Sequence, residues 1–312
     1  MIISASRRTD IPSYYSDWFF NRLNAGYVYV RNPMSIHKIS NIPLTKDVVD
    51  GFVFWTKNPV PMLNKIHFLK DYTYYFQFTV NSYGNDIEPN IPSKNDVIIP
   101  TFQRLSSEIG KERVIWRYDP IFLNEKYTME YHKRYFEKMC DKLSNYTQKC
   151  TISFLDLYRN MQRNIAKQGI ITLNSSQIIE IAESFSVIAK EHNIYIDTCA
   201  EKIDLEKYGI KHAHCIDQER LECIGGYKLN ANKDKNQRVE CGCIESIDIG
   251  AYNTCKNSCI YCYANYSQKI VSRNFNFHDP NSPLLFGQVT ENDKIVKRKC
   301  SSIINKQIKL FD

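Results

Sequence analysis

The stretch "RVIWRYDPIF" (residues 113–122) is a short apolar run that contains an arginine and an aspartate. Its β-branched and aromatic side chains predict a buried strand, and a helical stretch follows at about 128–145. The same order of strand, polar end and helix recurs along the chain. Further strands are predicted at "MIISAS" (1–6), "DGFVFWTKNP" (50–59), "YTYYFQFTVN" (72–81), "CTISFLDLY" (150–158), "NIYIDTCAE" (193–201) and "IKHAHCID" (210–217). Further helices are predicted at about 14–24, 61–70, 96–110 and 174–192.

About seven strands that alternate with helices predict parallel βαβ units, and therefore an α/β fold. No glycine-rich dinucleotide fingerprint follows the first strand, which disfavours a nucleotide-binding doubly wound sheet. A full or partial (β/α) barrel is the better interpretation. We expect residues 1–224 to form this barrel and residues 225–312 to form a C-terminal cysteine-rich region that covers the barrel mouth. Beyond residue 267 we expect a basic, loop-like tail.

Polar residues follow the predicted strands, and in (β/α) barrels the chemistry gathers at the carboxyl ends of the strands. Arg7, Arg8 and Arg117 are candidates to hold an anionic group, because guanidinium groups bind phosphate or carboxylate through forked hydrogen bonds. Arg117 and Asp119 flank a tyrosine, so on an extended strand both side chains point to the same side. A structural ion pair between these two residues is the alternative.

Other strand ends carry candidates for further roles. Asp10, Asp119 and Tyr158 are candidates for orientation or proton transfer. Asn81 and Glu201 stand at two more strand ends and are candidates for cofactor binding. For each charged residue at a strand end taken singly, a solvated loop or a salt bridge is the alternative interpretation.

Composition and charge restrict the class of protein. No apolar run approaches the roughly 20 residues that cross a bilayer, so we expect no membrane association. Eleven cysteines without an export signal indicate thiolate–metal chemistry in a reducing cytoplasm, and disfavour a disulfide scaffold. The formal net charge is +7, and residues 225–312 hold 13 Lys/Arg against 8 Asp/Glu. This bias fits an anionic ligand or nucleic acid, and it fits an ordinary solvated surface equally well.

The segment "CKNSCIYC" (255–262) concentrates three cysteines, Cys255, Cys259 and Cys262, in a C-x3-C-x2-C spacing. Structural zinc takes four ligands, typically as two pairs, so a triplet leaves one coordination position open. An iron–sulfur cube held by three thiolates keeps one iron free to bind another molecule.

This segment, with Tyr261 just before its last cysteine, resembles the cluster loop of the radical S-adenosylmethionine (SAM) superfamily. The resemblance implies that Cys255, Cys259 and Cys262 bind a [4Fe-4S] cluster and that the free iron binds SAM. It implies that Tyr261 packs near the adenine of SAM. In that superfamily an electron from the cluster cleaves the sulfonium and releases a 5′-deoxyadenosyl radical, which takes a hydrogen atom from the substrate.

Two departures from the superfamily pattern concern the position of the loop and the contacts to SAM. The cluster loop usually follows the first barrel strand, whereas here seven predicted strands precede it. The Gly-Gly-Glu segment after the second strand is absent, and "FWTKNP" (54–59) stands there. The full chain, from "ISASRRTDIP" (3–12) to "CYAN" (262–265), also resembles an uncharacterised bacterial family, domain-of-unknown-function family 1848.

Four further cysteines should lie near the same barrel rim. Cys199 and Cys215 fall at consecutive strand ends, and Cys241 and Cys243 lie on the approach to the loop, with Gly242 between them. Four thiolates from three segments suit a second iron–sulfur cluster or a structural zinc. The alternative is that Cys199 and Cys215 are small buried residues of the core.

Together these features predict an oxygen-sensitive radical SAM enzyme with one [4Fe-4S] cluster, or two. Its predicted partners are an anionic small-molecule or nucleotide-containing substrate and an electron donor such as flavodoxin or ferredoxin. The alternative is a barrel stabilised by zinc or a structural cluster, which binds nucleic acid or a protein partner without turnover.

Overall fold

The centre of the molecule is a parallel β-sheet. The computed structural model describes residues 1–159 and 161–305. Within them the sheet has eight strands in the order β10-β1-β4-β5-β6-β7-β8-β9. The strands are β1 (Ile2–Ala5), β4 (Gly51–Thr56), β5 (Tyr74–Thr79), β6 (Val114–Ile121), β7 (Lys149–Phe154), β8 (Tyr195–Thr198), β9 (Lys211–His212) and β10 (Ile247–Asp248).

The order of strands in the sheet follows the order in the chain, except that β10 pairs with β1 at the far edge. This winding confirms the predicted α/β fold with a parallel sheet. No pairing joins the edge strands β9 and β10 within the described residues. The segments beside these two strands do meet, because the Ile244 amide donates to the Ile216 carbonyl at 3.1 Å.

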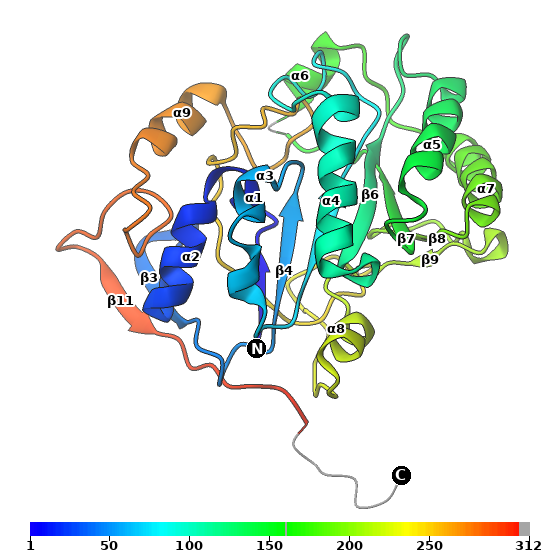
Figure 1. Cartoon of the computed structure of the whole chain (residues 1–312). Coiled ribbons are helices and arrows are strands. Elements are labelled where there is room, and N and C mark those ends of the chain that lie inside the picture. Colours follow the sequence, from blue (N-terminus) through cyan, green and yellow to red (C-terminus); the bar gives the residue numbers. More distant parts are fainter. Residues whose placement is uncertain (160, 306–312) are drawn as a thin grey trace, which may run out of the picture.

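Helices α2, α4, α5 and α7 cover one face of the sheet (Figure 1), whereas α8 packs on the opposite face through Leu221. The apolar sides of the first four pack on strand residues of the main core: Phe19 of α2 contacts Phe54 of β4 edge-on, and Phe136 of α5 stacks on Trp116 of β6. The predicted helices are all present, with the stretch at 61–70 divided into α3 and a 3-10 turn. The helices are α1 (Ile11–Tyr14), α2 (Ser16–Ala25), α3 (Val60–Leu63), α4 (Ile99–Ile109), α5 (Met129–Leu143), α6 (Gln162–Lys167), α7 (Ser175–Glu191), α8 (Gln218–Gly225) and α9 (Gln268–Asn276).

The opposite face of the sheet is filled by the chain that follows β9. Alternate strand residues form a second core with this segment, because side chains along a strand point to opposite faces. Tyr75 and Gln77 of β5 both donate to the Cys215 carbonyl, at 2.7 and 2.9 Å. The strand members of this second core are Ile2, Val53, Tyr75 and Ile115, and the covering segment supplies Cys215, Ile216, Leu221, Leu229, Cys241, Cys243 and Ile244.

A small sheet lies beside the main one and was not predicted. It consists of the hairpin β2 (Tyr27–Asn32) and β3 (Ser35–Pro43), with β11 (Lys294–Lys297) added in parallel to β3. The prediction of a loop-like tail beyond residue 267 was therefore wrong, because α9 and β11 lie within it. The β11 backbone gains its hydrogen bonds from β3, a partner that a local sequence pattern does not indicate.

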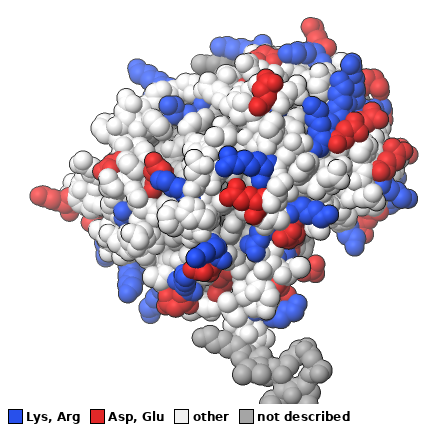
Figure 2. All heavy atoms as spheres, in the orientation of Figure 1, with Lys and Arg blue, Asp and Glu red and all other residues white. Residues whose placement is uncertain are grey.

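No helix in the described part of the chain is both long enough and apolar enough to span a membrane. Lys and Arg side chains are interspersed with Asp and Glu over the face shown in Figure 2. On that face the positive residues do not gather into one continuous patch.

Candidate functional site

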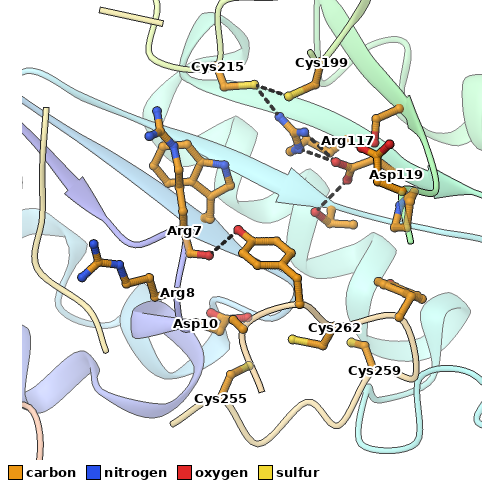
Figure 3. A pocket seen from close by; sticks show the side chains of 18 of the residues that line it. Arg7, Arg8, Asp10, Arg117, Asp119, Cys199, Cys215, Cys255, Cys259 and Cys262 are labelled. Atoms are coloured by element: carbon orange, nitrogen blue, oxygen red, sulfur yellow. Dashed lines mark hydrogen bonds and ion pairs between the residues drawn. The ribbon is translucent and has the colours of Figure 1, made fainter. Parts of the chain in front are cut away.

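A cavity of about 430 Å³ opens where the strands of the main sheet end. It gathers side chains from both ends of the chain (Figure 3). The predicted site residues that line it are Arg7, Arg8, Asp10, Arg117, Asp119, Tyr158, Cys199, Cys215, Cys241, Cys243, Cys255, Cys259, Tyr261 and Cys262. Asn81 and Glu201 are not among its lining residues.

The loop cysteines, Cys255, Cys259 and Cys262, reach the cavity from a segment fastened to the N-terminal helices. The Asn257 side chain donates to Asp10 Oδ2 at 3.0 Å and accepts a hydrogen bond from the Tyr14 hydroxyl at 2.8 Å. Asp10 comes from "RRTDIP" (7–12), so one function of this N-terminal segment is to position the late loop.

The other side of the loop is fastened to the chain after β5. The Ile260 amide donates to the Ile87 carbonyl at 3.0 Å, and Tyr261 donates its hydroxyl hydrogen to Glu88. Glu88 is 1% exposed and pairs with Lys57 at 2.8 Å and Lys94 at 2.6 Å. Although burial opposes the shift, these two cations lower the pKa of Glu88 to about 2. A buried, doubly paired carboxylate therefore fixes the Tyr261 ring against the cavity.

Asn81 supports Tyr261 from behind. Its side-chain amide lies 3.1 Å from the Tyr261 hydroxyl, and it exchanges hydrogen bonds with the backbone of Asp119. Glu201 accepts a hydrogen bond from the Phe154 amide at 2.8 Å. The structure thus places the two predicted cofactor-binding residues in supporting contacts outside the cavity wall.

The loop thiols are in a setting that disfavours free thiolates. Burial raises the pKa of Cys255 well above its ordinary value and raises that of Cys259 to about 12. Such thiols need a cationic partner to ionise, and metal ligation supplies one. Asp10, the neighbouring carboxylate, accepts hydrogen bonds from the Ser13 amide, the Lys57 amide and Asn257, so it is engaged as an anchor.

The rim cysteines, Cys199, Cys215, Cys241 and Cys243, form a second sulfur group on the cavity wall. Cys199 Sγ and Cys215 Sγ lie 3.1 Å apart. All four line the cavity, and the Ile216 amide beside Cys215 donates to Cys243 Sγ at 3.3 Å. The sequence prediction that these residues would share one rim agrees with this placement. Across residues 1–159 and 161–305, no three His, Cys, Asp or Glu side chains already converge as the ligands of one metal ion.

Arg117 and Asp119 form an ion pair with each other, as the structural alternative predicted. Arg117 Nε lies 3.0 Å from Asp119 Oδ2, and Arg117 Nη1 donates to Gln77 Oε1 at 3.2 Å and to Cys215 Sγ at 3.1 Å. Because the buried guanidinium is occupied by these groups, Arg117 is tied to the rim cysteines more than it is open to a ligand.

Arg7 has spare hydrogen-bonding capacity at the cavity. Its guanidinium lies 5.3 Å from the centre of the Trp55 ring and 3.9 Å from Asp234. Within the described structure its Nη2 atom is buried and has no hydrogen-bond partner. Arg8 lies 3.9 Å from Asp248 and packs over the Tyr252 ring. Arg7 is therefore the better placed of the two to bind an anionic group.

Several residues that shape the site were missed from the sequence. Arg238 is one of them: at the outer edge of the cavity it contacts the predicted residue Tyr158 and pairs with Asp156. Glu88 lies in a loop without any motif, and Asn257 lies inside the cysteine motif at a position that the spacing of the cysteines leaves unspecified. Only their tertiary contacts with Tyr261 and Asp10 identify them.

Comparison with known proteins gives a family and no assigned reaction. A family model described as "Domain of unknown function (DUF1848)" matches residues 2–264. The match includes the N-terminal "RRTDIP" segment, the rim cysteines and the loop cysteines. No curated protein matches the chain.

Proposed function

The chain belongs to the DUF1848 family, and from its site we propose that it is a radical SAM enzyme acting on an anionic substrate. Cys255, Cys259 and Cys262 would hold a [4Fe-4S] cluster through three of its irons. The observation that carries the proposal is that these three thiols, from one short loop, line a cavity at the strand ends. In (β/α) architectures this is the edge where substrates react.

The donor set fits such a cluster. Three cysteines from one loop leave one iron without a protein ligand, and the nearby Asp10 is held by three hydrogen bonds. When bound, the cluster and SAM would supply a carbon radical able to abstract hydrogen.

The chain's own residues would bind and orient the substrate and would shield the reacting centre from water. Tyr261, fixed by Glu88, presents a rigid aromatic wall beside the loop cysteines. Arg7 offers the buried and unpartnered Nη2 atom to a phosphate or carboxylate. The loop of residues 255–262 lies over the ends of the strands and would therefore limit the access of water to the reacting centre. Exclusion of water protects reactive intermediates.

The test is anaerobic reconstitution with iron and sulfide, followed by reduction in the presence of SAM. We expect 5′-deoxyadenosine to form with the native protein. The variant Cys255→Ala should reduce its formation by at least about 100-fold, because a cluster with two protein ligands is not retained. The matched control is Cys223→Ala, which removes an exposed cysteine outside the cavity and should leave the yield unchanged.

A specific result would favour the alternative of binding without turnover. If the reconstituted native protein forms no 5′-deoxyadenosine, and Cys255→Ala binds SAM as the native protein does, the radical SAM proposal fails. Binding of a DNA or RNA oligonucleotide by that same protein would then support a nucleic-acid-binding barrel.

A further inference from the structure

Three of the rim cysteines, Cys215, Cys241 and Cys243, belong to the second core, but all four also line the cavity, which the buried cysteines of the main core do not. Cys140 and Cys150 are fully buried members of the main apolar core. Cys199 and Cys215 instead put their sulfurs 3.1 Å apart on the wall of a cavity. In Figure 3 this pair lies across the cavity from the loop cysteines, with Arg117 beside Cys215.

The fold brings these sulfurs together from three separate segments. Cys199 directly follows β8, Cys215 lies shortly after β9, and Cys241 and Cys243 come from the chain returning towards β10. Gly242 permits this return, because a Cβ atom there would lie only 2.3 Å from Cδ2 of His214. Three segments thus bring their sulfurs into one group, and the backbone at Gly242 lies close to the His214 ring. Packing of an apolar core does not by itself require such a gathering of sulfurs.

Hydrogen-bond donors are directed at the rim sulfurs. Arg117 Nη1 donates to Cys215 Sγ at 3.1 Å, and the Ile216 amide donates to Cys243 Sγ at 3.3 Å. N–H groups that point at sulfur stabilise the negative charge that thiolates carry when they bind a metal.

We propose that Cys199, Cys215, Cys241 and Cys243 are the four ligands of a second metal centre, separate from the one on the loop. Soft thiolate donors select zinc or iron–sulfur clusters. Cys199 Sγ and Cys215 Sγ now lie 3.1 Å apart, and no three ligand groups among the described residues converge on one ion position, so metal binding requires these side chains to spread. That spread favours a cluster, in which each thiolate binds a different iron. This inference does not rest on the proposed function, since the four ligands exclude the loop cysteines.

Metal content of matched variants tests the inference. Full-length native protein, the double variant Cys241→Ser/Cys243→Ser and the triple variant Cys255→Ser/Cys259→Ser/Cys262→Ser are purified anaerobically. Iron, sulfide and zinc are then counted per chain. We expect about eight irons in the native protein and about four in each variant if both centres are cubes. A rim zinc would appear as one ion that only the Cys241→Ser/Cys243→Ser variant loses.

Several outcomes separate this inference from the proposed function. If the Cys241→Ser/Cys243→Ser variant (the rim variant) loses metal and the triple variant of the loop cysteines (the loop variant) does not, the result supports the rim centre and contradicts the proposed loop cluster. A rim variant that keeps the full native metal content, with an unchanged melting transition, overturns the second centre. If the double variant does not fold, the metal content of Cys199→Ser, a substitution at a half-buried position, is measured in its place. Cys223→Ser, at an exposed position, is the control.

Discussion

The two sulfur groups on the cavity are built in different ways. The loop cysteines come from one segment of eight residues (255–262), and their spacing alone identifies them. The rim cysteines come from three segments that only the winding of the sheet brings together. A metal-binding loop can therefore be identified from local sequence, whereas a centre assembled between strands depends on the topology.

The two groups also differ in what holds them in place. The loop is fastened by side chains from distant segments, chiefly Asp10 and Glu88. The rim is held by other groups: the Ile244 amide donates to the Ile216 carbonyl, and the side chains of Tyr75 and Gln77 of β5 donate to the Cys215 carbonyl. Side-chain substitutions at the anchors should therefore disturb the loop and leave the rim intact.

The largest effect is expected from Glu88→Ala. The substitution leaves the largely buried cations Lys57 and Lys94 without their shared carboxylate. Removing one partner of a buried ion pair costs about 3–5 kcal/mol, and we expect a loss of this size in the free energy of unfolding by urea. The variant should also lose iron from the loop centre, because Tyr261 loses its acceptor.

Glu130→Ala is the matched control, since Glu130 pairs with Lys133 at an exposed site. It should change the unfolding free energy by less than about 0.5 kcal/mol. Equal stability of the Glu88→Ala and native proteins would show that the buried pair does not fasten the loop.

The next effect is a loss of stability at acid pH caused by the buried His132. His132 is fully buried, and its ring nitrogens bond to the Tyr118 hydroxyl at 2.9 Å and the Phe122 carbonyl at 2.8 Å. Burial lowers the pKa of His132 from 6.5 to about 4. Above pH 6.5 the ring is neutral in both the folded and the unfolded protein, so it adds no pH dependence to the stability. Between pH 6.5 and about pH 4 the unfolded protein binds a proton at this ring and the folded protein does not, so the free energy of unfolding falls as the pH falls.

Stability should therefore fall by about 3 kcal/mol between pH 6.5 and pH 4 through this residue. Urea unfolding at several pH values measures the slope, and His132→Asn is the comparison because it cannot titrate. If both proteins lose stability equally over this interval, the buried imidazole is not responsible.

The sequence predicted the sheet better than it predicted the walls of the cavity. Runs such as residues 113–122 are long and apolar, so each strand is visible locally, and the parallel sheet follows from alternation with helices. Strand-end residues such as Arg7 were found by the same reasoning. Asn81 and Glu201 were assigned to cofactor binding from position alone, although a strand-end residue can also turn its side chain into a supporting contact.

Glu88 and Asn257 escaped prediction for a physical reason. Their importance arises from partners far away in the chain, namely Tyr261 and Asp10, and no local pattern encodes such a pairing. Strand β11 was missed likewise, because it acquires its partner β3 from a segment more than half the chain away.

A smaller effect is expected from Asp10→Ala. The residue caps α1 through the Ser13 amide and also accepts hydrogen bonds from the Lys57 amide and Asn257. Losing a cap and leaving buried donors unsatisfied should lower the unfolding free energy by about 2 kcal/mol. The iron of the loop centre should be lost more readily to a chelator, while the rim metal stays. Asp17→Ala, at an exposed position, is the control, and an equal loss of metal from both centres would contradict the separate anchoring.

The smallest effect is expected from Gly242→Ala, which acts on the rim alone. The added Cβ atom would lie 2.3 Å from Cδ2 of His214, and because His214 is exposed its ring can move aside at a cost of about 1 kcal/mol. The displacement should reach Cys241 and Cys243 and speed the release of rim metal to a chelator, without changing the loop centre. His214→Ala in the same protein removes the obstacle, so the double variant should recover native metal retention and stability. A double variant that remains as impaired as Gly242→Ala would show that Gly242 is needed for backbone conformation and not for the close approach to His214.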